Sequence, residues 1–248
     1  MILRQYLHHE PVVAASYLLG CGGRGVGAIV DPVEDIDRYL TDAADLGLSI
    51  RYVIDTHLHA DHISGARRIA AATGASYLLF ANTEARFSFT PVHDGDVIEL
   101  GNVSARVLHT PGHTPEHIAL LVTDRTRGPE PWFVLTGHTL MVGDMGRTEL
   151  ATDAANGARA LFASAERLRA LPEHVEVLPG AFAGSVCGRG LSGKPHSTIG
   201  FEKRWNRAFS LTNEDEFVRM MLEEIPPVPP RAAEMRALNM GAPPAAAA

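Results

Sequence analysis

The amino-acid sequence predicts a layered α/β domain with helices added at its C-terminal end. Short apolar runs typical of strands alternate with amphipathic helical patterns, and tight turns separate them. Hydrophobic residues make up 46% of the 248 residues and charged residues 21%, a composition that can bury a sizeable core. We therefore expect a soluble globular protein in which strands and helices are mixed along the chain.

Charge and cysteine content favour a small-molecule ligand and a reducing environment. The formal net charge is −7 and no basic block stands out, which argues against nucleic acid or an anionic membrane as the partner. No run approaches the roughly 18 continuous apolar residues of a membrane span. Cys21 and Cys187 cannot form a disulfide framework, and residues 1–11 do not resemble a secretory leader. We therefore expect a cytoplasmic protein.

The first half of the chain reads as strands interrupted by two helices. Strands are expected at 16–19 and 27–30, followed by a helix that Gly47 ends. A short buried strand at 52–54 ends in Asp55. The remaining elements expected in this half are a helix over 64–72 that Gly74 stops, a hairpin over 96–108, and strands at 118–122 and 132–135.

The second half is mainly helical. A helix is expected from about 153 to 171 and a strand at 175–178. Thr212 and Asn213 indicate the start of another helix, which Pro226-Pro227 ends. The predicted organisation is one domain over 1–210, a C-terminal helical extension over 211–240 and a flexible, low-complexity tail over 241–248.

A cluster of histidines after the strand at 52–54 predicts a metal site. The segment from Asp55 to His62 reads DTHLHADH. Residues two apart in an extended loop point the same way, so His57 and His59 can share one ion while Asp61 and His62 face a neighbouring position. Three histidines and an aspartate within six residues are improbable as ordinary loop composition. Asp55 is placed to orient a ligand imidazole through its ring N–H.

This cluster resembles the HxHxDH signature of the metallo-β-lactamase superfamily. Residues 110–114 (TPGHT) match the family motif that supplies a third histidine ligand, here His113. Residues 136–140 (TGHTL) stand where the family has Thr-Gly-Asp. Residues 146–149 and 197–202 resemble the persulfide dioxygenase branch, relatives of the glyoxalase II thioesterases. The resemblance implies an αββα sandwich with its site at the sheet edges between the two halves.

Two departures from the family pattern predict a single metal. His138 stands where the family has the aspartate that bridges two metals or ligates a single iron, and Ala181 stands where related chains have a histidine. Two cations about 3.5–4 Å apart need an anionic bridge, which a neutral imidazole cannot supply. One metal is therefore expected, with Asp61 and His62 handling protons beside it. Its expected ligands are His57, His59, His113 and, as a further candidate, His138.

The identity of that metal follows from the resemblance rather than from the residues. The related dioxygenases bind Fe(II), and replacing their carboxylate by His138 leaves an all-imidazole site that suits iron, zinc, copper or nickel. We expect one Fe(II) per chain, with Zn(II) as the alternative. Losing the anionic ligand leaves a more positive metal, which favours a thiolate or persulfide anion.

Several other residues are weaker candidates. Asp144 is close to His138 in sequence and could replace the missing carboxylate, whereas Cys187 is expected to be a buried, inert thiol. His117 flanks the third motif and is treated as background. Three basic residues could hold substrate carboxylates: Arg147, Lys203 and Arg204.

Three functions remain open. The leading hypothesis is a mononuclear iron enzyme resembling persulfide dioxygenases, which oxidises a glutathione-type persulfide with O₂ to sulfite; His59 is then a fourth ligand or lies beside the substrate. The second is a zinc hydrolase of thioesters or lactones with Asp61 as base. The third is a non-catalytic binding protein. The expected partner is a small-molecule thiol or persulfide, and the terminal helices could pack across a two-fold axis in a homodimer.

Overall fold

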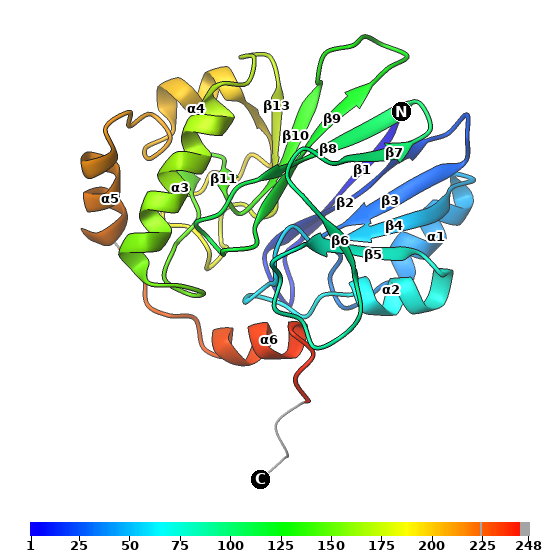
Figure 1. The fold of residues 1–248 in the computed structure, drawn as a ribbon, viewed down its shortest axis with the longest axis horizontal. Helices are drawn as coiled ribbons and strands as arrows, with labels where there is room; N and C mark the ends of the chain where they lie inside the picture. Colours follow the sequence, from blue (N-terminus) through cyan, green and yellow to red (C-terminus); the bar gives the residue numbers. More distant parts are fainter. Residues whose placement is uncertain (224, 244–248) are drawn as a thin grey trace.

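Two six-stranded sheets pack face to face between two layers of helices (Figure 1). The computed structural model describes residues 1–223 and 225–243. Helices α1 (Asp37–Asp45) and α2 (Ala66–Thr73) cover the outer face of the first sheet. Helices α3 (Ala154–Arg169), α4 (Ile199–Trp205) and α5 (Glu214–Glu223) cover the outer face of the second. This is the αββα sandwich that the family resemblance implies, and it agrees with the layered α/β domain expected from the strand and helix pattern.

The first sheet runs in chain order. Its strands are β1 (Ile2–His8), β2 (Ala14–Cys21), β3 (Val26–Val30), β4 (Ser49–Ile54), β5 (Ser76–Phe80) and β6 (Thr90–Val92). β1, β2 and β3 pair antiparallel, whereas β3 to β6 are parallel neighbours. Because β3 and β4 are parallel, the residues that follow them lie at the same edge of the sheet.

The second sheet has the order β14-β13-β10-β9-β8-β7. Its strands are β7 (Val97–Leu100), β8 (Val103–His109), β9 (Ile118–Asp124), β10 (Phe133–Gly137), β13 (Glu176–Pro179) and β14 (Ser197–Thr198). Only β10 and β13 pair parallel in this sheet; the other described pairs are antiparallel. β11 (Leu140–Met141) and β12 (Asp144–Met145) form a separate two-stranded ribbon after β10.

Three hydrophobic clusters hold the layers together. The central one lies between the sheets and includes Tyr17, Val30 and Leu120, all at most 1% exposed. The outer clusters pack α1 and α2 on the first sheet, and α3, α4 and α5 on the second. Burying one such side chain stabilises the fold by roughly 1.5–3 kcal/mol. The layers therefore fix where the loops at the sheet edges lie.

Local signals predicted most of these elements and their ends. Gly74 ends α2 in the left-handed conformation, with φ of 73°. The side chain of Asp153 accepts a hydrogen bond from the Asn156 backbone and caps α3. The Asn213 side chain does the same for Glu216 at the start of α5, as expected from the sequence.

Other elements carried too weak a local signal. β1 is an edge strand whose Leu3 and Leu7 are more than a third exposed, so its alternation does not stand out. β5, β6, α4 and the short strands of the ribbon were also not expected. These segments are short, and their form depends on the neighbours against which they pack.

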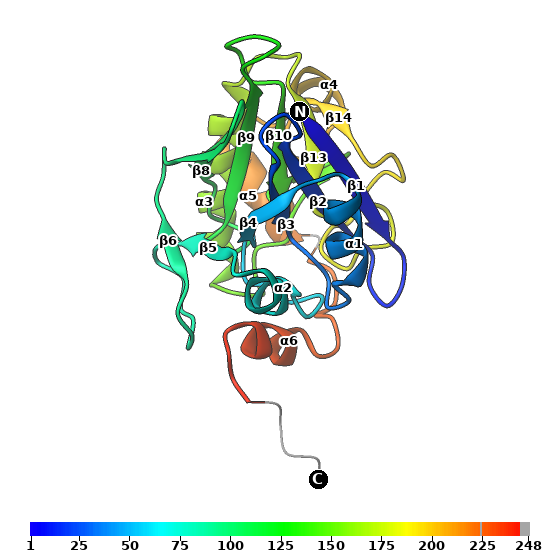
Figure 2. The same cartoon turned by 90° about the vertical axis from the view of Figure 1, so that its right-hand side faces the viewer.

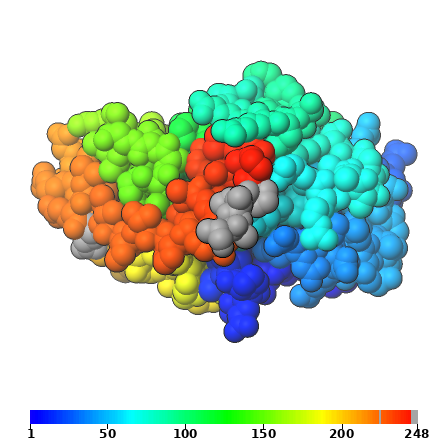
Figure 3. Space-filling view, turned by 90° about the horizontal axis from the view of Figure 1, so that it is seen from below, coloured from blue at the N-terminus to red at the C-terminus, as the bar shows by residue number. Residues whose placement is uncertain are grey.

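The C-terminal helix lies across the lower face of the molecule. α6 (Ala232–Asn239) lies below α2 in Figure 2, and Figure 3 shows this segment, in red, between the halves that contain α2 and α3. Residues 244–248 of the predicted tail lie outside the described residues, and the division of the chain at residue 211 stays a prediction. Among the described residues, no helix is long and apolar enough to cross a membrane.

Candidate metal centre

Three buried imidazoles from three separate loops meet at one edge of the two sheets. His57 follows β4, His113 follows β8 and His138 follows β10. Their ring centroids are 4.8 Å apart for His57 and His138, 4.9 Å for His57 and His113, and 5.0 Å for His113 and His138. All three side chains are at most 2% exposed. Each offers a nitrogen within 4.8 Å of those of the other two.

Two glycines allow the loops of His113 and His138 to pack closely against their neighbours. Gly112 has a φ of 139°, and a Cβ there would come within 2.5 Å of the Leu161 backbone in α3. Gly137 has a φ of 49°, and a Cβ there would lie 2.6 Å from Nε2 of His117. Neither position admits a side chain without strain. These contacts thus explain why a glycine directly precedes His113 and His138 in their motifs.

Hydrogen bonds to neighbouring groups fix which nitrogens of these rings are available. Nδ1 of His113 donates to the Arg147 carbonyl at 2.7 Å, which leaves the Nε2 lone pair free. The Thr56 hydroxyl donates to Asp31 at 2.9 Å, so its oxygen accepts from Nδ1 of His57, also at 2.9 Å. Nε2 of His57 is buried and has no partner among the described residues.

The electrostatics keep these three rings in the form that binds metals. Burial, followed by the neighbouring His138, lowers the pKa of His113 to about 3. Burial also lowers the pKa of His138, and it places the pKa of His57 well below its ordinary value. Neutral imidazole nitrogens ligate iron, zinc, copper and nickel. A divalent cation therefore fits this donor set.

The ring of His59 lies 4.2 Å from that of His57, but its nitrogens face carboxylates rather than the nitrogens of the trio. Its Nε2 is 3.2 Å from an Asp31 oxygen, and its Nδ1 is 3.6 Å from an Asp61 oxygen. Burial acts to lower the pKa of His59, but these two carboxylates raise it well above the ordinary value. The ligand atoms of His59 group with Asp61 and His62, and with Asp31 and Asp55, rather than with the other three histidines. The geometry thus groups three of the four expected histidine ligands and leaves His59 among the carboxylates.

Asp61 and His62 connect the trio to a cavity of about 650 Å³, which both residues line. Nδ1 of His62 is 3.1 Å from Oδ1 of Asp61, while Oδ2 of Asp61 is 4.0 Å from Nε2 of His138. Burial raises the pKa of Asp61, but His62 and His59 lower it well below the usual range. Asp61 is therefore a carboxylate between the trio and the cavity.

The two remaining acidic candidates have other partners. Asp55 accepts a hydrogen bond from the Tyr77 hydroxyl at 2.6 Å and lies 4.0 Å from Nε2 of His59. It therefore faces His59 rather than one of the trio. Asp144 is buried in β12 and pairs with Arg189 at 2.8 Å, so this ion pair occupies the carboxylate that was a weaker candidate to replace a metal ligand.

The structure places the three basic candidates in other surroundings. The Arg147 guanidinium is buried and bonds Glu149 and the carbonyls of Val186, Pro226 and Pro227. Lys203 and Arg204 lie on α4 and pair with Glu173. The contacts of all three are thus internal to the protein, and they do not favour the expected role in holding substrate.

Two residues that the sequence left out organise the trio. Asp31 follows β3 and accepts from the Thr56 backbone at 2.7 Å, which ties it to the histidine loop. Nε2 of His117 accepts from the His138 backbone at 3.0 Å, and its ring stacks on His57 with 23° between the planes. The sequence could have indicated Asp31, because it directly follows an apolar strand, as Asp55 does.

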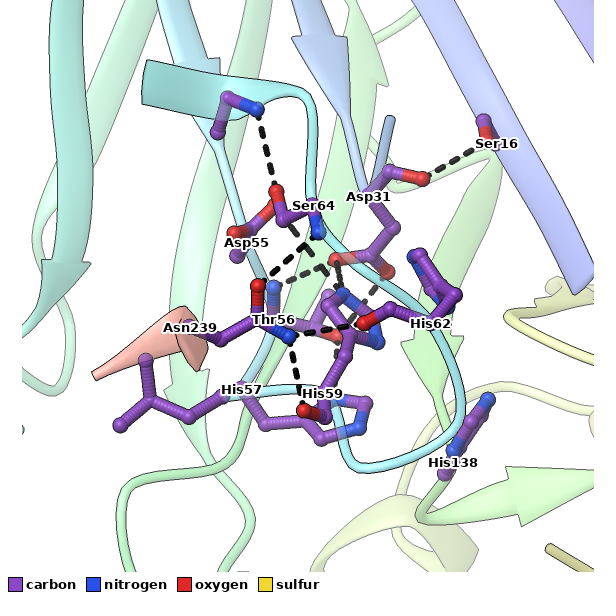
Figure 4. Close-up of polar contacts among 12 residues, drawn as sticks. Ser16, Asp31, Asp55, Thr56, His57, His59, His62, Ser64, His138 and Asn239 are labelled. Carbon is purple, nitrogen blue, oxygen red and sulfur yellow. Dashed lines mark hydrogen bonds and ion pairs between the residues drawn. The ribbon is translucent and has the colours of Figure 1, made fainter. Parts of the chain in front are cut away.

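α6 binds the backbone of the histidine loop (Figure 4). The Asn239 amide donates to the carbonyls of His59 and His62, both at 2.8 Å, and its oxygen accepts from the Ser64 backbone at 3.0 Å. Arg236 donates to the Leu58 carbonyl at 2.9 Å. No local sequence pattern indicates these contacts between α6 and the histidine loop, because the bonded residues lie more than 170 positions apart.

The chain is similar to proteins of two reaction classes. It is 33% identical to the hydroxyacylglutathione hydrolase of Rhodospirillum rubrum over 66% of this chain and 60% of that protein, and thus spans less than two thirds of its length. It is 28% identical to the mitochondrial persulfide dioxygenase ETHE1 of Homo sapiens over 89% of this chain and 80% of that protein.

Two solved structures share the fold. A metallo-beta-lactamase of Staphylococcus aureus superposes with a TM-score of 0.90 at 35% identity, over 96% of this chain and 72% of that one. ETHE1 of Myxococcus xanthus superposes with a TM-score of 0.82 at 30% identity, over 97% and 99%. The family model of the metallo-beta-lactamase superfamily matches residues 9–180, well over half of the sequence. The chain therefore belongs to the metallo-beta-lactamase superfamily.

Proposed function

We propose that the protein is a non-haem iron enzyme that oxidises the terminal sulfur of a glutathione-type persulfide with O₂ and, with one water, yields sulfite, the free thiol and two protons. The observation that carries this proposal is the trio of neutral imidazoles, His57, His113 and His138, beside a cavity. When bound, a divalent iron would supply coordination positions for the persulfide sulfur and O₂. The match to ETHE1 over nearly the whole of both chains supports the same reaction class.

The cavity offers groups for a substrate that carries both signs of charge. Arg38 and Arg68 line it, and guanidinium groups bind carboxylates. Glu10, Glu34 and Asp35 line it as well and could face an ammonium group. A γ-glutamyl peptide thiol carries two carboxylates and one ammonium, so its charges match this lining. These residues replace Arg147, Lys203 and Arg204 as candidates for holding substrate.

Asp61 is the residue placed to handle protons. Its carboxylate lies between the trio and the cavity, and one of its oxygens has no partner among the described residues. That oxygen is placed to accept a proton from a persulfide that enters as the neutral S–H form. His62, whose Nδ1 contacts the other oxygen of Asp61, holds that carboxylate in place.

Oxygen uptake after anaerobic reconstitution with Fe(II) tests this function. We expect uptake when glutathione persulfide is added, with sulfite as the product. The His113→Ala variant should lose it, whereas His93→Ala, which changes an exposed histidine, should retain it. Uptake by the native protein no greater than that of His113→Ala would refute the proposal.

A zinc-dependent thioester hydrolase is the second candidate. The hydrolase relative and the ionised Asp61, which could act as a base toward a metal-bound water, favour it. Elemental analysis of protein expressed without added metal separates the two candidates. Zinc without iron, together with turnover of a glutathione thioester, would favour hydrolysis and exclude the dioxygenase.

A further inference from the structure

The imidazole of His138 faces two different groups of ligand atoms. Its Nδ1 lies 3.3 Å from Nε2 of His113, a separation usual for two ligands of one ion. Its Nε2 points the other way and lies 4.0 Å from Oδ2 of Asp61. Asp61, His138 and Cys187 form a group of their own, with ligand atoms that all lie within 4.8 Å of one another.

The two polar atoms at the centre of this second group lack partners. Oδ2 of Asp61 and Nε2 of His138 are buried and accept or donate no hydrogen bond among the described residues. Both side chains are only 1% exposed. Leaving such atoms unpaired costs free energy, so two of them buried 4.0 Å apart favour a bound species between them.

Cys187 is fixed beside these two residues by its own loop. Its backbone N–H donates to the Ser185 hydroxyl at 3.2 Å, and its carbonyl accepts from the Arg147 backbone at 3.1 Å. The Arg147 carbonyl in turn holds the ring of His113. The thiol is therefore tied through one residue to the first metal site. A buried thiol is neutral by itself, but a coordinated divalent cation displaces its proton.

We propose that Asp61, His138 and Cys187 hold a second cation of the zinc type, with His138 shared between the two sites. One oxygen, one nitrogen and one sulfur donor form a three-ligand set that zinc accepts, and the fourth position would face the cavity that Asp61 lines. Ala181 stands where related chains have a histidine ligand. This site does not need that histidine, because the sulfur of Cys187 is its third ligand atom.

The proton balance of this site is defined. When both cations are bound, the thiol of Cys187 loses its proton to become a thiolate, and His138 loses its ring N–H proton to become an imidazolate. Both protons go to solvent, and no electrons are transferred. The imidazolate supplies the anion between two cations that a neutral imidazole lacks. This site differs from the expected single metal per chain. With the second cation bound, Asp61 is a ligand, so its role as proton acceptor belongs to the protein that holds iron alone.

Titration of the metal-free full-length protein with Co(II) tests the proposal without any turnover. We expect two cobalt ions per chain and a near-ultraviolet absorption band from a sulfur-to-cobalt transition. Cys187→Ala should bind one cobalt and lose the band. Cys21→Ala, which removes the other buried cysteine, should bind two and keep it. His113→Ala should lose one cobalt and keep the band.

The outcomes separate this inference from the proposed function. Saturation of the native protein at one cobalt, absence of the band, or its persistence in Cys187→Ala would each overturn the second site. A fold check by circular dichroism accompanies each variant, and the native protein alone decides if Cys187→Ala does not fold. None of these results depends on persulfide oxidation, and failed oxygen uptake would leave the cobalt result intact.

Discussion

His138 stands where the resembling family has a carboxylate, and its contacts show how the chain positions an imidazole there. Its backbone N–H is held by His117, and the ring is buried between His113 and Asp61. We expect His138→Ala to weaken metal binding more than the roughly 10- to 100-fold typical of losing an outer partner. Competition with a chelating dye measures this. His93→Ala is the matched control, and equal affinity of the two variants would show that His138 is no ligand.

His8 provides a second prediction at the scale of one residue. Its Nε2 contacts the hydroxyls of Ser16 at 3.0 Å and Tyr39 at 3.1 Å. Burial, followed by repulsion from His62, lowers its pKa from 6.5 to about 4. Because the folded-state pKa lies below the unfolded one, the stabilisation is complete above pH 6.5. It is lost as the pH falls toward 4, at no more than about 1.4 kcal/mol per pH unit.

Urea unfolding of the metal-free protein at pH 7 and pH 5 measures this effect. The native protein should lose more stability over that interval than His8→Gln, by about 1 kcal/mol after allowance for solvent screening. His93→Gln should behave like the native protein. A His8→Gln variant with the same loss would mean that His8 titrates alike in both states.

At the scale of single residues, the sequence predicted the candidate metal ligands better than the residues that hydrogen-bond to them. The spacing of His57 and the motif around His113 identified residues that the fold brings together. The spacing did not distinguish His57 from His59, because the direction of each ring depends on Asp31, which follows another strand. A hydrogen bond across two strands leaves no trace in local spacing.

The element that most directly supports the histidine loop is α6. The Asn239 amide binds the loop through three backbone groups, and Asn239 is only 5% exposed. We expect Asn239→Ala to destabilise the protein by roughly 1–3 kcal/mol, because buried carbonyls lose their donor. We also expect metal affinity to fall by about 10-fold, as for other outer partners. Chemical unfolding and dye competition measure the two effects.

The comparison variants at α6 distinguish positioning from mere packing. Asn239→Asp keeps the acceptor for Ser64 but places a carboxylate against the carbonyls of His59 and His62, so it should weaken metal binding at least as much as alanine. Arg231→Ala removes an exposed ion pair at the start of the same helix and should change neither quantity. Unaltered metal affinity in both Asn239 variants would contradict the positioning role.

Whether an element could be predicted depended on whether its signal was local. The hairpin of β7 and β8 turns at Gly101-Asn102, and α3 has its cap at Asp153, so both follow from neighbouring residues. α6 is different, because Asn239 and Arg236 bind residues near position 60. The role of α6 therefore required the fold, although a helical extension was expected there.

The whole molecule places its candidate metal ligands where the two halves of the sandwich meet. The loop after β4 belongs to the first sheet, and the loops after β8 and β10 belong to the second. The central hydrophobic cluster joins the sheets, so it also fixes the distance between His57 and the other two ligands. A metal that binds all three therefore crosslinks the halves, and folding and metal binding should be coupled.

Thermal unfolding with and without a chelator tests that coupling. At a free metal concentration about 100 times the Kd, binding stabilises the folded state by about 2.7 kcal/mol. For a chain of this length that corresponds to a rise in Tm of roughly 5–10 °C. EDTA should reverse the rise, and His113→Ala should show a much smaller one. A non-catalytic binding protein that no longer binds a metal would have the same Tm with added metal as with EDTA. That result would contradict the coupling and both proposed metal sites, because neither His57 nor Asp61 would then hold an ion across the sheets.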